Sequence, residues 1–192
     1  MVRERNTRVT SAGRIDFKTS LGMLQRVFKW MATDLERCLD MEPGPNFVVA
    51  MVLSEYTEIM GGFATGKLCD VGKSAENYRR FLEYLDCYYE QLDSQLDLYA
   101  TVRCGLAHEY FVKGPSTIVW RKSRALEKGV YLNGNRIVFN CEAYYKDWKD
   151  AVSKYMRDME TDQNLQKNLV KVVDALITRP TSRPLYRISP ES

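Results

Sequence analysis

Hydrophobic residues recur every three to four positions through most of the chain, and this period predicts amphipathic helices. The pattern predicts helical stretches at about 20–41, 46–60, 74–89, 94–111, 141–160 and 163–178. The breaks between them carry glycine or proline, as in Glu-Pro-Gly-Pro at 42–45, the glycine-rich segment 61–72 and Gly114-Pro115. These residues stop helices and form turns, so we expect short connections between the helices.

The period changes between residues 116 and 140, where short runs of β-branched and aromatic residues appear at Thr117–Trp120, Val130–Leu132 and Ile137–Phe139. The sequence Asn133-Gly134-Asn135 between the last two runs is typical of a tight hairpin turn. We therefore predict a mainly α protein: an up-and-down helical bundle with a small β-hairpin inserted after the fourth helix. Residues 1–192 are expected to form one helical domain, with polar, basic tails at 1–16 and 179–192 and the insertion at 116–140.

The composition is that of a globular protein, with 45% hydrophobic and 28% charged residues. The longest apolar run, Phe47–Leu53, is far shorter than the roughly 20 residues of a membrane span and is followed by Glu55. The basic N-terminus is not followed by the apolar core of a signal peptide. These features predict a cytoplasmic protein that does not associate with a membrane.

The net charge of +3 is concentrated at the two ends of the chain. Residues 1–18 and 179–192 are basic, whereas residues 19–178 contain 20 Lys and Arg against 22 Asp and Glu. Basic tails either keep a protein soluble or contact nucleic acid. The five cysteines, at positions 38, 69, 87, 104 and 141, lack the close spacing of a zinc site or disulfide framework. We expect no metal and no cofactor.

The chain contains a single histidine, His108, five positions after Arg103. Histidine is the side chain whose unperturbed pKa lies near neutrality, so it can give or take a proton at physiological pH. Arginine is always cationic and suits a phosphate group. Together an imidazole and a guanidinium can cleave RNA without a metal. The alternative is a helical bundle in which both residues are ordinary surface groups.

The segment Arg103-Cys-Gly-Leu-Ala-His108-Glu-Tyr110 resembles the R-x4-H-x-Y motif of the HEPN superfamily of helical domains. The match covers eight residues and falls on the fourth predicted helix. The resemblance implies a metal-independent ribonuclease, in many members a toxin or defence effector, that acts as a homodimer. It assigns phosphate binding to Arg103 and acid–base catalysis to His108. It makes Tyr110 an auxiliary residue, which in toxins a partner nucleotidyltransferase can modify.

Two features depart from the family pattern. Cys104 stands where the family usually has a polar residue, so we include it as an auxiliary position together with the nearby Lys113. Residues five apart are also separated by about 140° on an ideal α-helix, which would place Arg103 and His108 on different faces unless Gly105 lets the helix distort. The leading hypothesis is cleavage of single-stranded RNA. The alternative is a non-catalytic HEPN-like module for RNA or nucleotide binding, or for dimerisation.

Three other patterns are interpreted as structural. Gly61–Lys67 has the spacing of a phosphate-binding loop, but Leu68 replaces the Ser or Thr that would hold magnesium, and no strand precedes it. Glu55 and Glu58 have the spacing of a solvated helix face. The aromatic residues Tyr84, Tyr88, Tyr89, Tyr99, Tyr110 and Phe111 are attributed to the core or to a dimer interface rather than to base stacking.

Overall fold

The computed structural model describes residues 15–119 and 128–178. It confirms a mainly helical bundle with a small β insertion after the fourth helix region. Its elements are α1 (Phe17–Leu39), α2 (Asn46–Thr65), α3 (Ser74–Leu85), α4 (Cys87–Leu96), the π-helical segments η1 (Tyr99–Arg103) and η2 (Gly105–Glu109), β1 (Ser116–Val119), β2 (Val130–Asn133), β3 (Arg136–Asn140), α5 (Cys141–Thr161) and α6 (Gln163–Thr178). Most of the two predicted tails, and Trp120 of the first predicted strand, lie outside the described residues.

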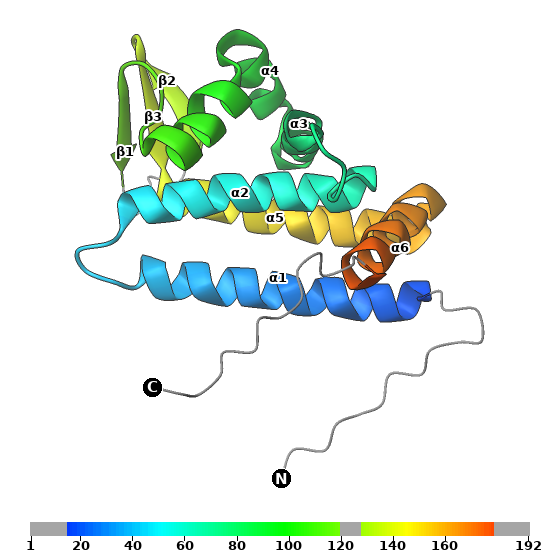
Figure 1. The fold of residues 1–192 in the computed structure, drawn as a ribbon. Helices are drawn as coiled ribbons and strands as arrows, with labels where there is room; N and C mark the ends of the chain where they lie inside the picture. Colours follow the sequence, from blue (N-terminus) through cyan, green and yellow to red (C-terminus); the bar gives the residue numbers. More distant parts are fainter. Residues whose placement is uncertain (1–14, 120–127, 179–192) are drawn as a thin grey trace, which may run out of the picture.

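Helix α2 is the central element of the bundle (Figure 1). It lies between α1 on one side and α3 with the π-helical segments on the other, next to α5, and α6 crosses one end. Its inward side packs against large residues of α3 and α5 that are fully buried: Tyr78, Phe81, Tyr144, Trp148 and Tyr155. The buried hydroxyl groups of Thr57 and Tyr144 form a hydrogen bond of 3.0 Å across this interface.

The same helix is long and apolar enough to cross a membrane, judged by length and composition alone, with a mean hydropathy of 1.3 over the relevant window. No other helix in the described part of the chain has this property. Of that window, 56% is buried inside the protein. A central core helix needs an apolar sequence for packing, and the expectation that the protein avoids membranes stays a prediction.

The β insertion forms a three-stranded sheet in the order β1-β3-β2 (Figure 1). Strands β2 and β3 pair antiparallel with Asn133 opposite Arg136, so a two-residue loop joins them, as the sequence predicts. Gly134 in that loop has φ of 62°, a value that glycine adopts without steric cost. Strand β1 pairs parallel to β3. At the end of β3, the Asn140 side chain accepts a hydrogen bond from the Ala143 backbone and begins α5.

The third and fourth predicted helices have different boundaries from those expected. The predicted helix at 74–89 is divided at Asp86, whose side chain accepts a hydrogen bond from the Tyr88 backbone and caps α4. The predicted helix at 94–111 is divided at Asp97, which has a left-handed backbone with φ of 47°. Arg79 of α3 binds Asp93 and Asp97 at 3.0 and 2.8 Å and holds this break. Local polar contacts therefore end the helices at positions where the hydrophobic pattern continues.

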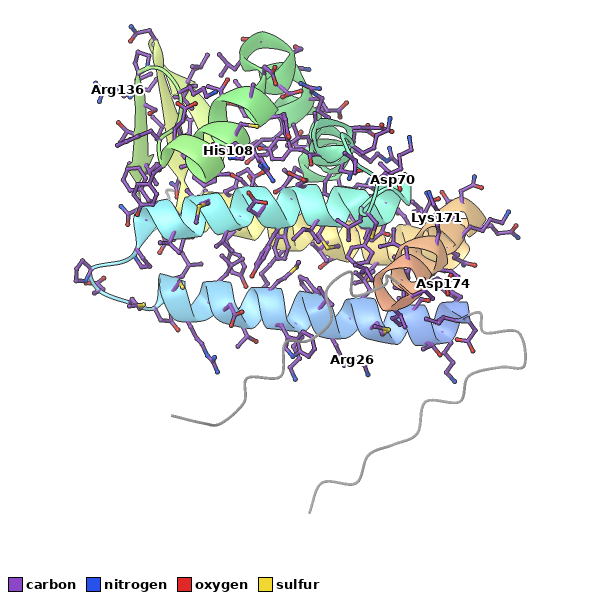
Figure 2. All side chains as sticks on the ribbon, viewed as in Figure 1. Arg26, Asp70, His108, Arg136, Lys171 and Asp174 are labelled. Atoms are coloured by element: carbon purple, nitrogen blue, oxygen red, sulfur yellow. The ribbon has the colours of Figure 1, made fainter. Side chains whose placement is uncertain are left out.

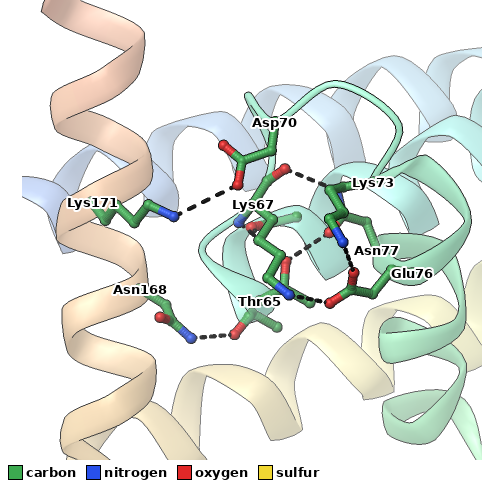
Figure 3. Close-up of polar contacts among 10 residues, drawn as sticks. Thr65, Lys67, Asp70, Lys73, Glu76, Asn77, Asn168 and Lys171 are labelled. Carbon is green, nitrogen blue, oxygen red and sulfur yellow. Dashed lines mark hydrogen bonds and ion pairs between the residues drawn. The ribbon is translucent and has the colours of Figure 1, made fainter.

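The predicted loop at 61–72 is wrong at its start, because α2 continues to Thr65. A β-carbon on Gly61 would lie 1.7 Å from the Asn77 backbone oxygen, so glycine is required for α3 to approach this closely. The remaining connection is fixed on both sides (Figure 3). Lys67 and Lys73 form ion pairs with Glu76 of α3, while Asn168 of α6 donates to the Ala64 carbonyl at 2.7 Å. Lys67 is thus engaged within the protein, consistent with a structural role for this glycine-rich segment.

Candidate functional site

The motif segment, residues 103–110, covers the last residue of η1 and the whole of η2, two π-helical turns that meet at Cys104. Its hydrogen bonds include those from the Cys104 N–H to the Tyr99 carbonyl and from the Tyr110 N–H to the Gly105 carbonyl, each spanning five residues. A π-helical turn therefore closes on the fifth residue. The wider turn reduces the 140° separation expected on an α-helix and brings Arg103 and His108 to about one turn apart.

Gly105 permits this winding by the absence of a side chain. A β-carbon on it would lie 2.4 Å from the Phe111 backbone oxygen, because the chain folds back over the helix after Tyr110. Two backbone hydrogen bonds hold this return, from Phe111 to the Gly105 carbonyl and from Lys113 to the Thr101 carbonyl at 2.9 Å. The sequence predicts a distorted helix here only if Gly105 permits it, and the structure contains this distortion.

Arg103 points toward α2, where two carboxylates hold its guanidinium. Its Nη2 donates a hydrogen bond to Glu55 Oε2 at 2.9 Å. Its Nε lies 2.5 Å from Glu58 Oε2, an ion pair without hydrogen-bond geometry. The side chains of Arg103 and Glu58 are only 13% and 12% exposed, whereas Glu55 is 35% exposed. The Arg103 guanidinium also lies over the ring of Tyr99, with its central carbon 5.8 Å from the ring centroid, a cation–π contact.

The interpretation of Glu55 and Glu58 as a solvated face is therefore wrong. Both are half-buried or nearly buried partners of Arg103, supplied by a helix 48 residues earlier in the chain. One sequence signal points to them: they are the only charged residues within Asn46–Thr65. A charge retained in a core helix needs a partner, and Arg103 is that partner.

Burial and the neighbouring charges shift the pKa values of Glu55 and Arg103. Burial raises the pKa of Glu55, and the charge of Glu58 adds to the rise, although Arg103 and His108 act in the opposite direction. Burial alone would lower the pKa of Arg103, but the carboxylates of Glu55 and Glu58 outweigh it, so the net shift is upward. Arg103 stays fully cationic, and Glu55 holds its proton to a higher pH than a free glutamate does.

His108 is exposed on the motif segment above α2 (Figure 2). Its imidazole influences the Glu55 carboxylate electrostatically, so Arg103 and His108 act on the same acidic side chain. Within residues 15–119 and 128–178 the imidazole forms no hydrogen bond or ion pair. His108 is therefore open to solvent and available to a ligand that approaches Glu55.

The three auxiliary residues differ in their surroundings. Cys104 is half-buried and hydrogen-bonded to Tyr99, where it helps to raise the pKa of the Tyr99 phenol, after burial, which contributes more. Lys113 forms an exposed ion pair with Glu109 at 3.0 Å. Tyr110 has a left-handed backbone with φ of 62° and ends η2. Arg103 and His108 therefore both act on the Glu55 carboxylate, and Cys104 acts on Arg103, whereas Tyr110 stacks on Phe47 and Lys113 pairs with Glu109.

An aromatic patch formed by Phe47, Tyr110 and Phe111 lies beside the motif segment. The rings of Phe47 and Tyr110 are stacked, with centroids 5.1 Å apart and an interplanar angle of 14°, and Phe111 meets Phe47 edge-on. Tyr110 and Phe111 are 53% and 63% exposed. Tyr84 and Tyr89 of the same predicted aromatic series are buried in the core, so only part of that series packs inside the protein.

Among the described residues, no group of three or more His, Cys, Asp or Glu side chains is arranged to hold a metal ion. Comparisons of the chain with protein-family models, with curated proteins and with solved structures gave no match.

Proposed function

We propose that the protein is a metal-independent endoribonuclease of HEPN type that cleaves single-stranded RNA through Arg103 and His108. The observation that carries the proposal is that both motif residues, on the π-helical segments η1 and η2, act on Glu55: Arg103 donates a hydrogen bond of 2.9 Å to it, and the exposed His108 influences its carboxylate electrostatically. A guanidinium and an imidazole together form a minimal apparatus for phosphodiester transesterification. The exposed imidazole transfers a proton, and the cation stabilises charge on the phosphoryl oxygens.

The ion pairs of Arg103 are compatible with phosphate binding. A guanidinium has five N–H donors in a planar fork. The contacts to Glu55 and Glu58 engage Nη2 and Nε, which leaves Nη1 for an incoming phosphate. The carboxylates also fix the orientation of the fork, so that less conformational freedom is lost when a phosphate binds.

The purified full-length protein tests this proposal when it is incubated with single-stranded RNA in EDTA. We expect cleavage to a 2′,3′-cyclic phosphate and a 5′-hydroxyl, and no cleavage of the same oligonucleotide made with 2′-deoxyribose. His108→Ala should abolish cleavage. Arg26→Ala, on α1 across α2 from His108, should retain it (Figure 2). A wild-type protein inactive in EDTA, or a fully active His108→Ala variant, contradicts the proposal.

A second candidate is a non-catalytic module for RNA or nucleotide binding, or for dimerisation. It is favoured by the engagement of Arg103 with two carboxylates and by the exposed aromatic patch of Phe47, Tyr110 and Phe111. Retention of RNA on a filter without any change in RNA length would support it. An apolar patch of this kind also suits a homodimer contact. In a toxin–antitoxin pair, Tyr110, which is 53% exposed, would be the residue that a nucleotidyltransferase modifies.

A further inference from the structure

Both Arg103 and His108 act on the carboxylate of Glu55. It projects from α2 with about a third of its side chain exposed, accepts the hydrogen bond from Arg103 Nη2 at 2.9 Å, and is influenced by the charge of His108. The charged groups that act on it are Arg103 from η1, His108 from η2 and Glu58 from α2 itself. Nothing in the R-x4-H-x-Y motif includes this residue, because it lies 48 positions before Arg103.

Cleavage of RNA by its own 2′-hydroxyl needs two proton transfers on opposite sides of the phosphate. One group removes the proton from the 2′-oxygen, and another delivers a proton to the departing 5′-oxygen. A single imidazole in one state cannot do both in the same step. Arg103 is permanently protonated and transfers no proton, so the reaction needs a second titratable group besides one His108 imidazole.

The two glutamates of α2 differ in how well each could act as the second proton-transfer group. Glu58 is 12% exposed and lies against Arg103 Nε, so it anchors the cation and does not reach a substrate. Glu55 is more exposed, contacts Arg103, and is influenced by the charge of His108. Burial and the neighbouring Glu58 carboxylate raise the pKa of Glu55, which makes it a stronger base than a free glutamate once it is deprotonated.

We propose that Glu55 is the general base of the reaction and that His108 is its general acid; this rests on the proposed ribonuclease function. The Glu55 carboxylate takes the proton of the 2′-hydroxyl, and the 2′-oxygen forms a bond to phosphorus. The bond between phosphorus and the 5′-oxygen breaks, and the His108 imidazolium gives its proton to that oxygen. Arg103 stabilises the negative charge on the non-bridging oxygens. The products are a cyclic phosphate and a 5′-hydroxyl, and water is not consumed.

The test is the pH dependence of kcat/KM on a single-stranded RNA for the wild type, Glu55→Gln and Glu58→Gln. The wild type should show an acidic limb from Glu55, whose carboxyl has to lose its proton before it can act as the base. Glu55→Gln keeps an oxygen that accepts the Arg103 hydrogen bond but has no titrating carboxyl. We expect it to lose about 10²- to 10⁴-fold in rate, and to lose the acidic limb. Glu58→Gln should keep that limb but shift it to lower pH, because the Glu58 charge that raises the pKa of Glu55 is removed.

The outcomes separate the two proposals. A Glu55→Gln variant that keeps the acidic limb and a near wild-type rate overturns the role of Glu55, while the ribonuclease function stands. A wild type that does not cleave RNA in EDTA overturns both. Thermal unfolding shows whether Glu55→Gln is folded, and Glu55→Asp provides a second variant that retains a carboxyl. Glu55→Asp should be slower than wild type and still show the acidic limb, and loss of that limb in Glu55→Asp contradicts the proposal.

Discussion

Arg103 is the counterion of two acidic side chains, and its removal leaves both without a partner. We expect Arg103→Ala to lower the free energy of unfolding by about 3 kcal/mol, since an uncompensated carboxylate at a nearly buried site is costly. Glu58, which is 12% exposed, should account for most of this loss. Urea denaturation measures the change.

The surface ion pair between Lys149 and Glu36 provides the matched control. Its nitrogen and oxygen are 3.1 Å apart, but its side chains are 44% and 51% exposed. Lys149→Ala should therefore cost less than about 1 kcal/mol. Equal losses in the Lys149 and Arg103 variants would contradict the structural role of Arg103. This role also explains why loss of cleavage in Arg103→Ala says little about catalysis, and why the exposed His108 is the better test.

Among the helical elements, the motif segment depends on one glycine. Gly105→Ala would place a β-carbon 2.4 Å from the Phe111 backbone oxygen, a backbone atom that cannot rotate away. We expect a loss of about 1–3 kcal/mol in the free energy of unfolding, together with a displacement of His108 relative to Arg103 and reduced cleavage of RNA. Chemical denaturation and a cleavage assay measure the two effects.

Gly22 of α1 is the control for this substitution. A β-carbon there has no atom within 4 Å. Gly22→Ala should therefore stabilise the protein by about 0.4–1 kcal/mol, because alanine loses less conformational entropy than glycine when a helix forms. A Gly105→Ala variant that is equally stabilised would contradict the close contact between Gly105 and the Phe111 backbone.

Hydrophobic periodicity was sufficient to predict the helices and the β insertion, because a buried helix face or strand pair leaves a regular pattern in the sequence. It was not sufficient to predict the divisions at Asp86 and Asp97, where one polar side chain caps or bends the chain. The α-helical geometry assumed for the motif also failed, since π-helical winding arises from the return of Phe111 and Lys113 over Gly105. Glu55 was misjudged because its partners, Arg103 and His108, are close only in the folded protein.

For the whole molecule, the distribution of charge bears directly on RNA binding. The proposed site contains Glu55 and Glu58, with Glu109 nearby in the ion pair with Lys113. Residues 19–178 carry 20 Lys and Arg against 22 Asp and Glu. This part of the chain therefore supplies little net attraction for a polyanion. If the protein binds RNA, much of the electrostatic attraction has to come from the basic segments 1–18 and 179–192, which are almost entirely outside the described residues.

The salt dependence of RNA binding tests this division of roles. The segment 179–192 contains three arginines, Arg179, Arg183 and Arg187. Each phosphate that a cation neutralises on a single strand contributes about 0.7 to the slope of log affinity against log salt concentration. Replacing the three arginines with glutamine should therefore make the slope shallower by about 2, as measured by fluorescence anisotropy with a labelled RNA.

The control replaces three exposed cations of α1, Arg26, Lys29 and Arg37, with glutamine in the same full-length chain. This triple variant has the same net charge as the tail variant, but its changes lie across α2 from the motif segment. Its slope should remain close to that of the wild type, because only cations that contact phosphates release counterions. Equal changes in both variants would show that net charge alone matters. An unchanged slope in the tail variant would assign the 179–192 arginines to solubility rather than to RNA contact.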